Sequence, residues 1–276
     1  MTQDINSIIN IIERSSESYS TPVYIPSLKK EVNFREISTA QHKRILKSTI
    51  DDPVYNSLFI KTMYSIIKEN CVGDVDFNKL TIIDKMFIIL HLRSVSIGDT
   101  ISVELQSKND ESSTYKSDFK ITNVIKNAKK VVKNIEPETL EIGPYKIHCS
   151  VPNILTECKI EEELRNDEIG DMNTAEDIRE TFAEKFISEI CKFINKIEIV
   201  KDEAVDVNLE EYSFKDRITL IEKLPSNVAE AVVKYMGKVN SEIEKVTILN
   251  KNVTINEQKE EFSYQLSLDA TFFTGF

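Results

Sequence analysis

The chain has 276 residues, of which 41% are hydrophobic and 29% are charged, a balance that supports one large globular domain or two small ones. Its formal net charge of −11 and its pI near 5.0 disfavour binding to DNA or to anionic membranes, because such binding needs clustered Lys and Arg. We therefore expect neither nucleic acid nor a membrane as a partner.

The sequence also predicts an intracellular protein. The N-terminus is acidic, unlike a secretory signal, and the longest strictly apolar run, Met86 to Leu90, is far short of the roughly 20 residues that span a bilayer. The cysteines are too scattered for a disulfide framework or a zinc knuckle, so we expect reduced thiols in a cytoplasm: Cys71, Cys149, Cys158 and Cys191.

Residues 1–20 are predicted to form an N-terminal amphipathic tail. Isoleucines recur there at helical spacing, and the pattern ends at Ser15 to Ser18. The sequence leaves open whether this tail docks on the body of the protein or on a partner.

Residues 21–99 are predicted to form a hairpin followed by three helices. Two extended runs, residues 23–25 and 32–34, flank a turn that begins at Pro26, which favours a hairpin at a sheet edge. Helix starts are indicated by three capping patterns: Ser38 with Gln41, Asp52 with Pro53, and Thr81 with Asp84. Residues 82–95 are apolar on nearly all sides, which predicts a central buried helix.

Residues 100–170 are predicted to be a β-rich segment that ends in a linker. Alternation around residues 101–105 and 119–121 indicates a second hairpin, and residues 140–147 indicate a third around Gly143 and Pro144. A short basic helix is expected at residues 126–133. Residues 161–180 carry many acidic side chains without a clear period, so we interpret them as a domain linker that could also steer a basic partner.

Residues 171–276 are predicted to be helical with C-terminal strands. The first helix is expected from Thr174, with a buried face that consists of Ile178, Phe182, Phe186, Ile190, Ile194 and Ile197. A helix follows around residues 214–221, and another starts at Ser226 with a near-heptad apolar seam that favours a helix pair within the chain. Strict alternation over residues 262–270 indicates a strand with an apolar tail. The predicted fold class is therefore α+β, with a helical N-terminal region that carries a β-hairpin, a central β-rich segment, and C-terminal helices with terminal strands.

The aromatic tail has two open interpretations. Phe272, Phe273 and Phe276 would be buried either on the protein's own core or in a partner.

No catalytic constellation is visible. The glycines are too dispersed for a phosphate-binding loop, and the aromatic residues are not interleaved with Lys and Arg as stacking platforms require. Only His148, Cys149 and Cys158 could hold a metal or activate a thiol, yet adjacent strand residues point to opposite faces, which makes His148 a poor base for Cys149. We predict no catalytic residue, cofactor or metal, and keep a thiol- or metal-dependent hydrolase as the alternative from another class.

Several blocks of the sequence carry a resemblance to a known family: residues 24–28, 32–41, 45–48, 76–77, 80–85, 92–98, 224–236 and 268–273. Together these blocks resemble the baseplate hub subunits and hub-assembly chaperones of T4-like contractile-tailed phages. The resemblance covers the first hundred residues and about the last sixty, and it supplies no catalytic or ligand residues.

The resemblance implies a non-enzymatic protein of the infected host's cytoplasm that acts in tail assembly with other baseplate hub proteins. It leaves open whether the protein is a transient chaperone or a permanent structural component of the virion, and an oligomer is compatible with either. Three contact surfaces are predicted: the hairpin edge at Tyr24 and Ile25, the acidic stretch 161–180, and the C-terminal Phe272, Phe273 and Phe276.

Overall fold

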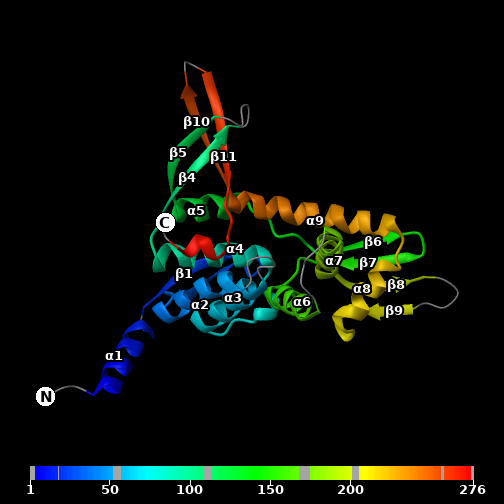
Figure 1. Cartoon of the computed structure of the whole chain (residues 1–276), viewed down its shortest axis with the longest axis horizontal. Helices are drawn as coiled ribbons and strands as arrows, with labels where there is room; N and C mark the ends of the chain where they lie inside the picture. The colour runs from blue at the N-terminus through cyan, green and yellow to red at the C-terminus, as the bar shows by residue number, and fades with distance from the viewer. Residues whose placement is uncertain are drawn as a thin grey trace. The chain divides into compact units, whose positions relative to one another are not determined.

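The computed structural model describes residues 4–17, 19–51, 57–107, 113–167, 175–200, 205–255 and 258–274 (Figure 1). The chain forms two compact units: unit 1 comprises residues 1–132 and 243–276, and unit 2 comprises residues 133–242. Both combine helices with antiparallel sheets, which confirms the α+β class. The unit boundaries differ from the boundaries expected at residues 20, 99 and 170.

Unit 1 is built around two antiparallel sheets. Its helices and 3-10 turns are α1 (Ile5–Glu17), α2 (Thr39–Asp51), α3 (Ser57–Asn70), η1 (Phe77–Lys79), α4 (Ile82–Ser96), α5 (Ile121–Val131) and η3 (Ala270–Phe273). One sheet has the order β1 (Ser20–Ile25), β2 (Lys30–Arg35), β3 (Cys71–Val72). The other has the order β10 (Ile248–Ile255), β11 (Gln258–Gln265), β4 (Thr100–Ser107), β5 (Thr114–Lys120).

The first hairpin and the central helix form as the sequence predicts. In β1 and β2, Val23 faces Val32, and both side chains are buried. The capping box of α4 joins the two elements, because Asp84 accepts hydrogen bonds both from the Thr81 amide, at 2.7 Å, and from the Ser27 amide in the hairpin turn, at 2.9 Å. Helix α4 is buried on most of its surface, as its uniform apolarity requires.

The capping predictions for the other two helices have different outcomes. Ser38 and Gln41 form the expected reciprocal hydrogen bonds at the start of α2. Asp52 and Pro53 lie outside the described residues.

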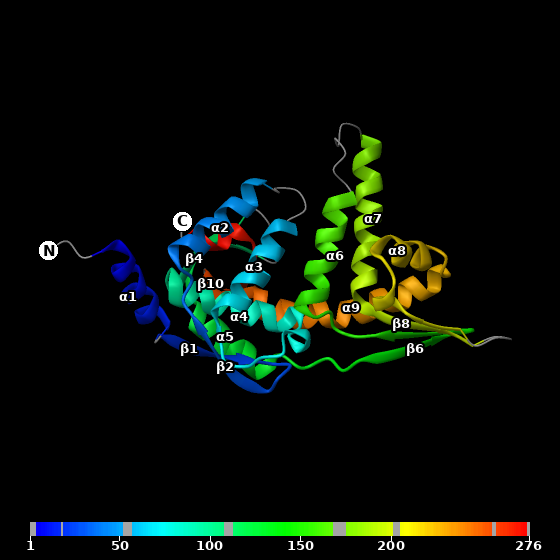
Figure 2. The same ribbon diagram turned by 90° about the horizontal axis from the view of Figure 1, so that it is seen from below.

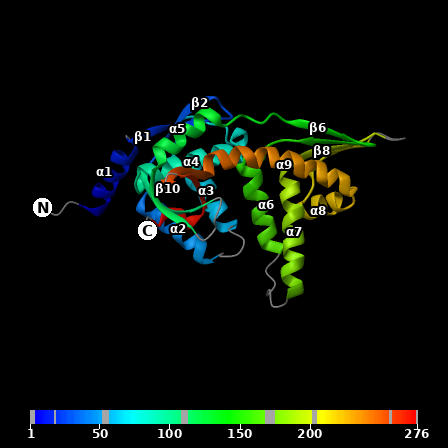
Figure 3. The same ribbon diagram turned by 90° about the horizontal axis from the view of Figure 1, so that it is seen from above.

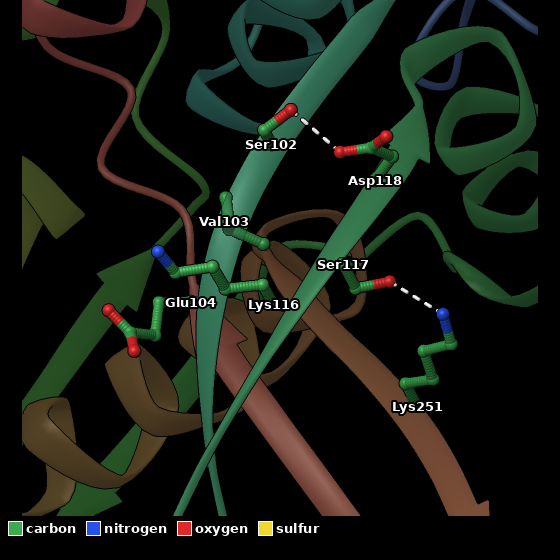
Figure 4. A pocket seen from close by; sticks show the side chains of 7 residues that line it. All are labelled: Ser102, Val103, Glu104, Lys116, Ser117, Asp118 and Lys251. Atoms are coloured by element: carbon green, nitrogen blue, oxygen red, sulfur yellow. Dashed lines mark hydrogen bonds between the residues drawn. The ribbon is translucent and has the colours of Figure 1, made fainter.

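The sheet at the C-terminal end of unit 1 differs in part from the sequence prediction. The hairpin β4–β5 is confirmed, but the strand expected over residues 262–270 ends at Gln265, and β10, which was not expected, pairs with β11 along its whole length. The sheet is strongly curled, since Lys251 on one outer strand donates a hydrogen bond of 2.7 Å to Ser117 on the other (Figure 4).

Unit 2 is a four-stranded sheet with helices. The strand order is β6 (Glu138–Ile142), β7 (Tyr145–Cys149), β8 (Ile194–Ile199), β9 (Val205–Asn208). Its helices and 3-10 turn are α6 (Ile154–Asp167), α7 (Ala175–Phe193), η2 (Leu209–Glu211), α8 (Phe214–Glu222) and most of α9 (Ser226–Thr247). The hairpin β6–β7 around Gly143 and Pro144 is confirmed.

The linker predicted at residues 161–180 is wrong in its described parts. Residues 161–167 form the end of α6, and residues 175–180 form the start of α7. These two helices lie side by side (Figures 2 and 3). A buried ion pair between Glu161 of α6 and Lys192 of α7 gives one acidic residue of the stretch a partner inside unit 2.

The helix expected from Thr174 is shorter than predicted. It ends at Phe193, and the two isoleucines expected on its buried face, Ile194 and Ile197, are buried in strand β8 instead. Ile190 is buried as expected, but Phe186 is 51% exposed. The seam of α9 is buried at Val228, Val232, Tyr235 and Val239.

Candidate interaction surfaces

The C-terminal phenylalanines dock on the protein's own core. Phe273 is fully buried and Phe272 is 8% exposed, and their rings meet edge to face with centroids 5.8 Å apart. Their turn, η3, packs against α2. Neither Phe272 nor Phe273 is free for a partner in this structure, and partner binding by these two rings stays a prediction. Phe276 lies outside the described residues.

Polar contacts hold the same turn. The Phe272 carbonyl accepts a hydrogen bond of 2.9 Å from Nε of Arg93 in α4, and Nε2 of His42 in α2 lies 2.7 Å from the Phe273 carbonyl oxygen. Asp269 caps the turn by accepting hydrogen bonds from the amide and the hydroxyl of Thr271. Burial alone would raise the pKa of Asp269, but its hydrogen bonds with Ser267 and Thr271 hold that pKa below its ordinary value.

The hairpin edge offers less surface than the sequence suggests. Ile25 is fully buried, and Tyr24 is half-buried beneath the ammonium group of Lys129, which lies 4.4 Å from its ring centroid. Strand β1 is an outer strand, as expected, but Pro22 in its middle has no amide hydrogen to offer an added strand. Partner binding at Tyr24 therefore stays a prediction, whereas Ile25 packs in the core.

His148, considered for catalysis together with Cys149 and Cys158, lies within hydrogen-bond distance of a hydroxyl and a carboxylate. His148 lies between the hydroxyl of Thr139, 3.0 Å from Nδ1, and the carboxylate of Glu198, 3.0 Å from Nε2. Burial raises the pKa of the Cys149 thiol to about 12, so it is protonated at neutral pH and is a weak nucleophile. Among the described residues no group of three or more His, Cys, Asp or Glu side chains is arranged to hold a metal ion.

A groove of about 720 Å³, lined mostly by polar side chains, lies beside β4 and β5 (Figure 4). Ser102 donates a hydrogen bond of 2.6 Å to Asp118 across the two strands, and the ammonium group of Lys251 is held by Ser117 and by the ring of Tyr115. These polar groups already bond to one another, which is typical of a solvated sheet surface.

The formal charge is segregated between the two units, a feature that sequence reasoning missed. Of the 46 acidic and 35 basic residues, unit 2 carries 25 and 14, whereas unit 1 carries 21 and 21. The whole net charge of −11 therefore belongs to unit 2. The signal was present in the sequence, but it could be read only after the unit boundaries were known.

Helix α1 presents an apolar surface to solvent. Ile5, Ile9 and Ile11 are exposed by 65%, 44% and 57%. The amphipathic helix predicted in the N-terminal tail is confirmed and continues to Glu17. Solvent-exposed isoleucines on one short helix are typical of a surface that docks on another molecule.

None of the helices in the described parts of the chain has the length and hydropathy of a membrane-spanning segment. The features that face solvent there include the acidic unit 2 and the amphipathic helix α1. This distribution is typical of a protein that works through contacts with other proteins. The model of the family described as T4 bacteriophage base plate protein matches residues 17–261, so the chain belongs to that family. No curated protein and no solved structure gives a significant match.

Family membership assigns the chain a structural or assembly role in the phage tail baseplate, where its partners are other baseplate proteins. The matched range covers all of unit 2 and most of unit 1, and it leaves out residues 1–16, which include nearly all of α1, and residues 262–276.

Proposed function

We propose that this protein is a non-enzymatic component or chaperone of baseplate hub assembly, which acts in the host bacterial cytoplasm by binding other tail proteins. The family match over residues 17–261 is the observation that carries this proposal. The resemblance of residues 24–28, 32–41, 80–85 and 92–98 to hub subunits and hub-assembly chaperones extends the proposal from the baseplate to its hub.

The surface supports a binding role in physical terms. An acidic unit attracts basic surfaces over distances of about 8–10 Å at physiological salt, which raises the rate of association with a basic partner. Burial raises the pKa of the Cys149 thiol to about 12 and His148 lies within hydrogen-bond distance of Glu198, which disfavours the hydrolase alternative at these two residues.

The experiment that tests the proposal is inactivation of the gene in its phage, followed by electron microscopy of the infected-cell lysate. We expect a defect confined to baseplates or to tails that fail to form on them. Normal tails and normal infectivity would contradict the proposal.

Mass spectrometry of purified particles then separates the two roles. A permanent structural protein is present in finished virions in a fixed ratio to the other baseplate proteins, whereas a chaperone is absent from them although tail assembly depends on it.

A further inference from the structure

A groove in unit 2, lined by both apolar and polar side chains, has no role in the features described so far. It has a volume of about 430 Å³ and is lined by residues of α6, α7 and α8. Its floor consists of Leu164, Phe214 and Ile218, which belong to a small hydrophobic cluster completed by Ile160. Leu164 and Phe214 are buried, while Ile218 is half-buried, so the cluster remains open on the groove side.

The rim of the groove is acidic. Glu184 of α7 and Glu222 of α8 line it, and among the described lining residues Lys215 alone has the opposite charge. Both carboxylate residues are exposed. The surrounding unit carries the entire net charge of −11, so the local field reinforces the charge of the rim.

We propose that this groove binds a basic amphipathic helix of a partner protein. Apolar residues of that helix at positions i, i+3 or i+4, and i+7 would cover Leu164, Phe214 and Ile218, and flanking Lys or Arg side chains would meet Glu184 and Glu222. This proposal depends on the proposed function at one point, since it takes the partner to be another baseplate protein.

Charge complementarity selects this occupant over a second copy of the chain. Helix α1 is the exposed amphipathic helix that another copy would offer, but its residues Glu13, Arg14 and Glu17, with Asp4 just before it, make it net negative. An acidic helix would be repelled by the rim and by the charge of unit 2.

The test uses the full chain and two synthetic peptides that can form helices of about 14 residues. Both have leucines at positions i, i+3, i+4 and i+7; one has lysines and the other has glutamates at the remaining positions. Fluorescence anisotropy gives the affinity of each labelled peptide, and hydrogen exchange locates the bound peptide on the protein.

Two double variants with the same change in net charge are compared. Glu184→Lys with Glu222→Lys reverses the rim, whereas Glu136→Lys with Glu141→Lys reverses two exposed carboxylates before and within β6, away from the groove. We expect the rim variant to bind the lysine peptide about tenfold more weakly, chiefly through slower association, and the control variant to bind within about twofold of the wild type. Ile218→Ser should also weaken binding while leaving the salt dependence unchanged.

Protection of α8 amides by the lysine peptide, with no binding of the glutamate peptide, is the expected result. Equal losses in the rim and control variants would overturn the proposal, since they would show attraction to the acidic unit as a whole. Equal affinity for the two peptides, or no binding to the wild type, would overturn it as well. These outcomes are independent of the tail phenotype that tests the proposed function.

Discussion

The burial of Phe273 makes a quantitative prediction about stability. Phe273→Ala removes a fully buried ring that packs edge to face on Phe272, and leaves a cavity beside α2. Such truncations cost about 3–5 kcal/mol, out of a typical folding free energy of about 5–15 kcal/mol. The melting temperature should fall by roughly 6–20 °C, at about 2–4 °C per kcal/mol for a unit of this size.

The assay is thermal and urea unfolding followed by far-ultraviolet circular dichroism. Phe186→Ala is the matched control, because it deletes the same ring from a side chain that is 51% exposed, and it should cost less than about 1.5 kcal/mol. A Phe273→Ala protein that unfolds within about 1 kcal/mol of the wild type but no longer binds its partners would refute the packing argument. It would restore the view that the C-terminal rings insert into a partner.

Three further predictions follow from the other features. Lys192→Met should destabilise unit 2 by about 3–5 kcal/mol in urea unfolding, because it leaves Glu161 buried without its partner. The double variant Lys192→Met with Glu161→Leu should recover much of this loss. Equal losses of unfolding free energy in the single and double variants would argue against the ion pair. The pKa of Asp269 lies below its ordinary value of 3.8, so the stability that its carboxylate contributes is complete above pH 3.8 and is lost as the pH falls through the lower native pKa. The melting temperature of Asp269→Asn should therefore fall less steeply than that of the wild type below about pH 4. Parallel pH profiles of the two proteins would contradict this. Ile9→Ser on α1 should change the unfolding free energy by less than about 0.5 kcal/mol, and a larger loss would show that the helix packs on its own chain.

The local elements of unit 1 were predictable where short-range chemistry decides them. The capping pairs Ser38 with Gln41 and Thr81 with Asp84 start α2 and α4 as expected, because each pair satisfies amides within one helical turn. The unbroken apolar pattern of residues 82–95 likewise predicted a buried helix.

Features that depend on contacts distant in sequence were missed. Ile194 and Ile197 continue the helical spacing of α7, but pairing with β7 places them in β8. Residues 161–180 were predicted to be a linker because the local sequence does not show the partner of Glu161. That partner, Lys192, lies 31 residues away. In both cases tertiary packing overrides a local pattern.

The candidate contact residues were predictable only in part. The sequence indicated that the C-terminal phenylalanines must be buried, yet it could not choose between the protein's own core and a partner, because both remove the same apolar surface from water. The groove lined by Leu164 of α6, Glu184 of α7, and Phe214 and Ile218 of α8 combines three helices that only the fold brings together.

Co-expression of this chain with the other baseplate proteins of its phage, followed by size-exclusion chromatography with light scattering, is the most direct test that it acts by binding them. We predict co-elution with at least one baseplate protein as a complex of defined mass. Elution of this chain apart from every baseplate protein would contradict a role in baseplate assembly through protein contacts.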